Sequence, residues 1–125
     1  GVSSAASDVY KRQVLASGIR VLSYSGRRDF ICNFLGNAAW IDELVWSSEQ
    51  GFRKQAPLED WFVPGRRERA GQFRHYGNLT YVVVEEAGHF APLDQPASLL
   101  AMFQRWIHPA PGSIGRLDPV QLHAI

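Results

Sequence analysis

The sequence predicts an α/β fold, in which strands and helices alternate along the chain. Two apolar runs, from Ile19 to Tyr24 and from Leu79 to Glu85, each lead to a glycine and then to a single polar residue. A helical repeat of apolar side chains follows each run, over roughly residues 34–46 and again after Pro96. Because strands that feed helices favour parallel pairing, we expect an incomplete mixed sheet, mostly parallel, with flanking helices.

The first predicted element is a short buried strand from Ile19 to Tyr24, which Gly18 and Gly26 delimit. Asn33 is placed to cap the helix predicted over roughly residues 34–46. The apolar side chains of that helix recur at helical spacing, at Leu35, Ala38, Ile41, Leu44 and Val45. We expect them to pack in the core.

The middle of the chain, residues 47–77, has a mixed composition with several glycines and prolines. Short antiparallel strands are predicted there, around Trp61 and from Gln72 to Tyr76. The clearest strand follows, from Leu79 to Glu85, where four apolar residues stand in succession. Such continuous apolar character predicts a strand that is covered on both faces.

A final helix is predicted after Pro92, which keeps the residue before it extended. Asp94 or Gln95 can cap this helix, and Pro96 suits its first turn. Its buried stripe is predicted at Leu99, Leu100, Phe103, Trp106 and Ile107. Two prolines and a glycine then end the helix.

Three regions are predicted along the chain. Residues 1–13 are expected to be a non-native leader, because Asp8–Gln13 reads as the translated end of a sequencing adapter. Residues 14–109 are expected to form the folded portion. Residues 110–125 show no sustained pattern and are expected to form a flexible tail.

The composition argues against several classes of protein. A net charge of +1 gives no reason to expect nucleic acid as a partner, and no apolar run approaches the roughly 20 residues of a membrane span. The single cysteine, Cys32, cannot form an internal disulfide. The remaining histidines, His75, His108 and His123, lack ligand spacing, so no metal and no other cofactor is expected. The oligomeric state stays open.

Asp29 and His89 are the candidate catalytic residues. They follow the two clearest strands, in the order that the acid and base of a serine triad take on an α/β-hydrolase sheet. A histidine acts as a general base near neutral pH, and a buried carboxylate on its other ring nitrogen fixes its tautomer. Because the strands should be neighbours, we expect the two side chains to meet. A solvated aspartate and an ordinary loop histidine are the structural alternative.

A serine nucleophile in the required context is missing from the sequence. Ser25 lies in Tyr-Ser-Gly and Ser113 in Gly-Ser-Ile-Gly, and neither matches the Gly-x-Ser-x-Gly elbow. With 125 residues, the chain is also shorter than the roughly 200–250 residues that hydrolases of this fold usually need. We therefore interpret it as the C-terminal part of an α/β-hydrolase fold.

Three segments resemble serine carboxypeptidases, particularly the carboxypeptidase Y-like branch. Asp29–Asn37 is similar to the aspartate motif of that family, and Ala87–Pro96 is similar to its histidine motif. Met102–Ile107 resembles its closing helix. The resemblance covers most of the sequence that follows the predicted leader.

The resemblance implies that Asp29 and His89 are the acid and the base of a Ser-Asp-His triad. It also implies that Cys32 is a thiol beside the substrate pocket and that Asn33 supports the same loop. Phe90 stands at this pocket where many relatives carry methionine, a change that bears on side-chain preference. The implied activity is the release of C-terminal residues from peptide substrates, through an acyl-enzyme on a serine outside this chain. A vacuolar or lysosomal location, or secretion, is implied as well.

Two other interpretations stay open. One is another α/β-hydrolase, such as a carboxypeptidase-like acyltransferase or an esterase, and the other is a non-catalytic relative that has lost its serine. Asn78-Leu-Thr80 also fits the sequon for N-glycosylation, which suits a secretory or vacuolar protein.

Overall fold

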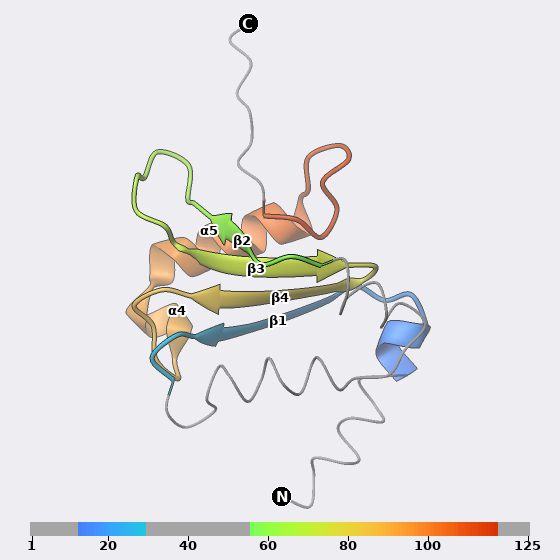
Figure 1. The fold of residues 1–125 in the computed structure, drawn as a ribbon, viewed down its shortest axis with the longest axis horizontal. Coiled ribbons are helices and arrows are strands. Elements are labelled where there is room, and N and C mark those ends of the chain that lie inside the picture. Colours follow the sequence, from blue (N-terminus) through green and yellow to red (C-terminus); the bar gives the residue numbers. More distant parts are fainter. Residues whose placement is uncertain (1–12, 30–55, 118–125) are drawn as a thin grey trace, which may run out of the picture.

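The computed structural model describes residues 13–29 and 56–117. The strands in these residues form one sheet in the order β1-β4-β3-β2. Their bounds are β1 (Val21–Gly26), β2 (Glu59–Trp61), β3 (Gly71–Tyr76) and β4 (Leu79–Val84), and helices α4 (Ala91–Asp94) and α5 (Pro96–Ile107) follow. Helix α5 runs along one face of the sheet (Figure 1). The predicted α/β class is confirmed, whereas the helix predicted over residues 34–46 lies outside the described residues.

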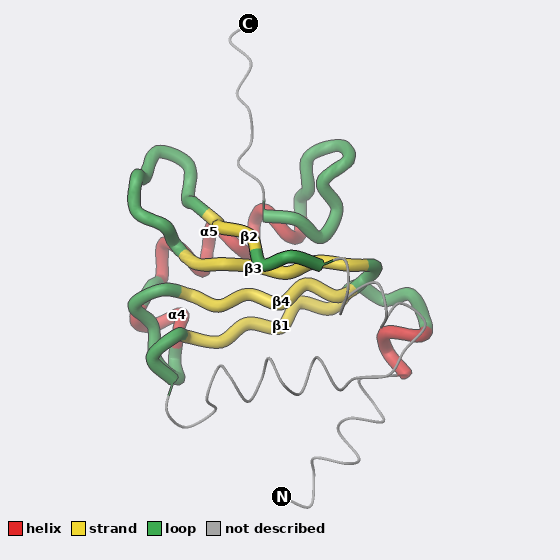
Figure 2. The backbone as a smooth tube through the Cα atoms, viewed as in Figure 1, coloured by secondary structure: helices red, strands yellow, loops and turns green. Residues whose placement is uncertain are grey.

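The sheet is mixed. β1 pairs parallel with β4, while β3 runs antiparallel to both β4 and β2. Among the described strands, parallel pairing is therefore confined to β1 and β4. This single parallel pair brings the ends of two strands that are far apart in the sequence to the same edge of the sheet (Figure 2).

A tight turn of two residues joins β3 to β4. Gly77 has a φ of 60°, which is the conformation that the first central residue of a type II′ turn requires and that favours glycine. Tyr76 pairs with Leu79 across this turn, and the antiparallel register continues from there. The antiparallel strand predicted from Gln72 to Tyr76 is thus confirmed.

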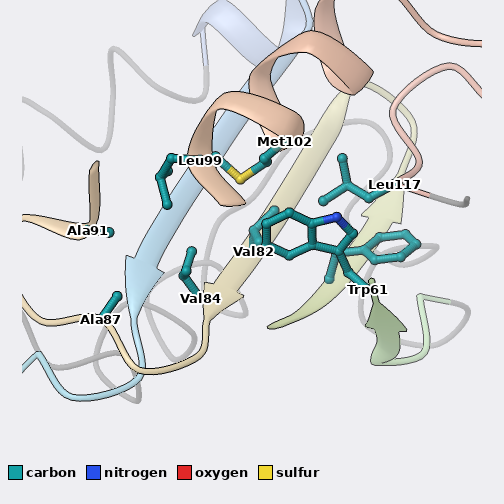
Figure 3. Packing of buried hydrophobic residues seen from close by; sticks show 9 residues of the cluster. Trp61, Val82, Val84, Ala87, Ala91, Leu99, Met102 and Leu117 are labelled. Atoms are coloured by element: carbon teal, nitrogen blue, oxygen red, sulfur yellow. The ribbon is translucent and has the colours of Figure 1, made fainter. Parts of the chain in front are cut away.

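Two apolar clusters lie on opposite faces of the sheet, and alternation along β4 separates them. Leu79, Tyr81 and Val83 belong to one cluster, and Val82 and Val84 to the other. All six residues of β4 are buried, as the apolar run predicts. Figure 3 shows the second cluster, in which the sheet packs against α4 and α5 through Trp61, Phe73, Val82, Val84, Ala87, Ala91, Leu99, Met102 and Leu117. Burial of each large apolar side chain stabilises the fold by about 1.5–3 kcal/mol.

Helix α5 begins at Pro96, whose missing N–H is not needed in the first turn. The side that faces the sheet carries Ser98, Leu99, Met102, Phe103 and Trp106, which are buried or partly buried. Leu100 is 58% exposed and Ile107 is 55% exposed. The predicted stripe is therefore wrong at these two positions, because they lie to the side of the line that Leu99, Met102 and Trp106 form.

Residues 115–117 pack against the sheet, which differs from the flexible tail expected over residues 110–125. Leu117 is 1% exposed and joins the second cluster. The Thr80 hydroxyl donates a hydrogen bond of 2.7 Å to the carbonyl of Gly115, and Arg116 forms an ion pair of 2.6 Å with Glu59. This packing consists of a single leucine and a few polar contacts. The sequence of this segment therefore carries no apolar pattern that would predict it. Residues 118–125 lie outside the described residues, as do residues 1–12 of the predicted leader.

Candidate active site

Asp29 and His89 come together where β1 and β4 end. Gly26 is paired with Val84 at the last step of the parallel register, so the loops that follow leave the same edge of the sheet (Figure 2). Nδ1 of His89 lies 3.4 Å from Oδ2 of Asp29. The side chain of Asp29 is 4% exposed and that of His89 is 37% exposed. The predicted meeting of the two side chains is confirmed, with a buried carboxylate beside an accessible imidazole.

Direct backbone contact holds the aspartate loop against the histidine loop. The N–H of Arg27 donates to the carbonyl of Val84 at 2.9 Å, and the N–H of Arg28 donates to the carbonyl of Ala87 at 2.8 Å. A Cβ on Gly26 would lie 2.2 Å from the carbonyl oxygen of Ala87. Only glycine allows these two segments of the backbone to approach this closely. This close approach explains why a glycine follows the first predicted strand.

Asp94 holds the histidine loop from the other side. Its Oδ2 accepts a hydrogen bond of 2.8 Å from the N–H of Gly88, the residue before His89. Glu86 in the same loop has a φ of 53°, which is rare outside glycine, and its carbonyl accepts a 3.3 Å hydrogen bond from Nε2 of Gln95. The sequence predicts Asp94 or Gln95 as a side-chain cap of the last helix. Gln95 does stand at the N-cap of α5, but no side-chain capping hydrogen bond forms, because both side chains are engaged by this loop.

Phe90 covers one side of the histidine. Its ring packs edge-on against the imidazole of His89, with the centroids 4.9 Å apart, and the residue is 68% exposed. An exposed aromatic surface thus lies directly beside the candidate base. Cys32 and Asn33, the other two residues predicted at the substrate pocket, lie outside the described residues.

Asn78 stands at the opposite end of β4 from His89. Its amide nitrogen donates hydrogen bonds to the carbonyls of Leu15 at 2.7 Å and Ile19 at 2.6 Å. This nitrogen is the atom that a glycan would modify, and the Thr80 hydroxyl of the sequon is itself buried. The contacts give Asn78 a structural role, since they fasten the turn before β1 to the hairpin.

The arrangement of Asp29 and His89 suits general base chemistry. A carboxylate on Nδ1 fixes the tautomer in which Nε2 accepts a proton from an attacking hydroxyl, and it stabilises the imidazolium that results. The 3.4 Å separation is long for a hydrogen bond, and such contacts commonly shorten once substrate is bound.

Among residues 13–29 and 56–117, no group of three or more histidine, cysteine or acidic side chains could hold a metal ion. No helix in the same residues is long and apolar enough to cross a membrane.

Comparison with known proteins identifies related sequences. Residues 2–109 match the family described as serine carboxypeptidase. Carboxypeptidase Y of Komagataella phaffii is 51% identical over 94 residues, which cover 75% of this chain and 17% of that protein. The vacuolar serine-type carboxypeptidase ATG42 of Saccharomyces cerevisiae is 39% identical over 98 residues, which cover 78% of this chain and 19% of that protein.

A solved structure supports the same relationship. The crystal structure of Kex1(Δ)p, a prohormone-processing carboxypeptidase from Saccharomyces cerevisiae, matches with a TM-score of 0.67 and 33% identity, covering 81% of this chain and 21% of that chain. A sheet that presents an acid and a base at neighbouring strand ends is the arrangement of an α/β-hydrolase. The chain belongs to the serine carboxypeptidase family, as its motifs predict. It spans 17–21% of the length of these three relatives.

Proposed function

We propose that the complete protein is a serine-type carboxypeptidase, which releases C-terminal residues from peptides. The observation that carries this proposal is the buried carboxylate of Asp29 beside Nδ1 of the accessible His89, in a chain of this family. Because the chain covers only a small share of its relatives, the proposal assigns the serine nucleophile and the oxyanion hole to the remainder of the protein.

In the proposed mechanism, Asp29 keeps the Nδ1 proton of His89 directed at its carboxylate. Nε2 then takes the proton of the serine hydroxyl as the serine oxygen attacks the scissile carbonyl. His89 returns this proton to the leaving amine, which departs as the free C-terminal residue and leaves an acyl-enzyme. Water, deprotonated by the same histidine, hydrolyses the acyl-enzyme and regenerates the serine.

Phe90 is proposed to contact the substrate close to the scissile bond, because its exposed ring lies against His89. Cys32 and Asn33 are proposed to line the same pocket, on the strength of the sequence motif alone. A vacuolar, lysosomal or secreted location is proposed as well. One relative is vacuolar by name, which supports it.

Substitution of the acid tests the proposal. In the complete protein, Asp29→Asn should lower kcat for a blocked dipeptide by about 10⁴-fold, because the amide no longer holds the reactive tautomer. Asp94→Asn is the matched control: an amide oxygen can still accept the hydrogen bond from Gly88, so only a small loss is expected. Near-normal turnover by Asp29→Asn would reject the assigned role. Acyl transfer from an ester donor without peptide hydrolysis would identify an acyltransferase instead.

A further inference from the structure

An ionic network at the ends of β1 and β4 takes no direct part in the proposed triad chemistry. Nε of Arg27 lies 2.9 Å from Oε2 of Glu85, and Nη2 of Arg27 donates a 2.7 Å hydrogen bond to Oε1 of Gln72. Arg27 and Glu85 are the first residues after their strands. Their side chains therefore connect the starts of the two loops, a few positions before Asp29 on one loop and His89 on the other.

Further contacts hold this connection in place. Oε1 of Glu85 accepts a 2.8 Å hydrogen bond from Arg69, and the same guanidinium reaches Oδ1 of Asp60 at 3.1 Å. Gln72 also donates to that oxygen at 3.1 Å. The network thus closes on itself with two cations, two anions and one amide, so it carries no net charge. The side chains of Arg27 and Glu85 are 31% and 19% exposed, and each has two partners within the network. These contacts restrain them more than an isolated surface pair would be restrained.

The neighbouring ion pair provides a contrast. Arg28 and Glu86 approach to 2.6 Å, but their side chains are 66% and 62% exposed. A solvated pair of this kind contributes little to structure, because water screens its charges and its side chains lose freedom when they pair. Two arginines in succession therefore differ in what they do: Arg27 is fixed within the network, and Arg28 faces solvent.

We propose that Arg27 and Glu85 are positioning residues that set the separation of Asp29 and His89, an inference that rests on the function proposed above. The acid and the base stand on separate loops, so their distance depends on how those loops are held together. The backbone bonds at the strand ends fix the main chains, and the Arg27–Glu85 contact fixes the first side chains beyond the paired residues. A displacement of about 1 Å in such a site costs about 10²-fold in rate.

The test compares two neighbouring arginines in the complete protein. Arg27→Gln and Arg28→Gln remove the same charge one position apart. For a blocked dipeptide, we expect Arg27→Gln to lower kcat by about 10–100-fold with KM within about twofold, since ground-state binding is not affected. Arg28→Gln should stay within about threefold of the wild type, as expected for a solvated pair. The rate of covalent labelling by diisopropyl fluorophosphate should fall in parallel with kcat, because labelling needs the activated serine and no peptide.

A double variant tests whether the two residues act through one contact. Glu85→Gln should resemble Arg27→Gln, and the combination should be no slower than the worse single variant. Thermal unfolding shows whether each variant is folded at the assay temperature. Should Arg27→Gln be unfolded there, Arg27→Lys decides, since it keeps the charge but only part of the hydrogen bonding, and an intermediate fall in kcat and labelling is expected.

The outcomes separate this inference from the proposed function. A wild-type protein that hydrolyses no peptide and resists labelling overturns the proposed function. An active wild type in which Arg27→Gln, or the folded Arg27→Lys, retains full kcat overturns the positioning role. Equal losses in Arg27→Gln and Arg28→Gln also overturn it, because they would indicate a general effect of charge.

Discussion

A methyl group at position 26 should separate the acid from the base. In Gly26→Ala, the new Cβ would lie 2.2 Å from the carbonyl oxygen of Ala87 and 2.4 Å from that of Gly88. The two loops must open by about 0.8 Å, from 2.2 to 3.0 Å, to reach the shortest separation that such atoms adopt. If this movement is passed on, the contact between Asp29 and His89 lengthens from 3.4 Å to more than about 4 Å, beyond a hydrogen bond.

The expected loss follows from this displacement. A shift of about 1 Å costs about 10²-fold in kcat, which is less than the roughly 10⁴-fold expected when the acid is replaced by an amide. The added methyl also strains a packed region, at a cost of about 1–3 kcal/mol in the free energy of unfolding. KM should change little, because the substitution does not contact the substrate.

The assay is hydrolysis of a blocked dipeptide by the complete protein, with kcat and KM measured separately. Gly88→Ala is the control, because its Cβ would meet only the end of the Asp94 side chain, at 3.3 Å. That variant should lose no more than about a few-fold in kcat, since the carboxylate can yield. If Gly26→Ala is folded and turns over within about threefold of the wild type, the close approach of the loops does not set the acid–base distance and the reasoning fails.

Two further predictions concern stability. Burial lowers the pKa of His75 below its usual value near 6.5, and the charge of Arg116 lowers it further. The folded protein therefore binds fewer protons than the unfolded chain below about pH 6.5, so stability present above that pH is lost on acidification. Between pH 7 and pH 5, the midpoint of thermal unfolding should fall less in His75→Gln than in the wild type, and equal falls would contradict the assignment. Asn78→Ala removes the hydrogen bonds to Leu15 and Ile19, so denaturant unfolding should show a loss of about 1–3 kcal/mol, and an unchanged free energy of unfolding would show that these bonds are not needed.

The strands and the meeting of Asp29 with His89 were predictable from local signals. The unbroken apolar run of β4 predicts burial on both faces, and all of its residues are buried. Gly26 is the last residue of β1 and marks where the chain leaves the sheet, while Gly88 lies four residues beyond the end of β4. The burial of the strands, the positions of their ends and the order of Asp29 and His89 along the chain all agree. Together they leave few ways in which the two loops can be placed relative to each other.

Contacts that depend on distant residues were not predictable. Arg27 and Glu85 stand 58 positions apart, and charged residues are too common for their pairing to be inferred without the register. Asp94 suits a helix cap by type and position, yet it binds Gly88 because the histidine loop folds back over it. The packing of Leu117 likewise depends on apolar neighbours that only the assembled sheet and α5 bring together. The predictions for Cys32 and Asn33 lie outside the described residues and stay predictions.

The parallel register of β1 and β4 has a consequence for how related chains can vary in length. Gly26 faces Val84 directly, so the separation of acid and base does not depend on how much chain connects the two strands. β3 and β2 lie on the side of β4 that faces away from β1. A longer loop before or between them would therefore add residues away from the ends of β1 and β4. Related chains can therefore gain or lose residues between these strands while the acid and the base keep their places.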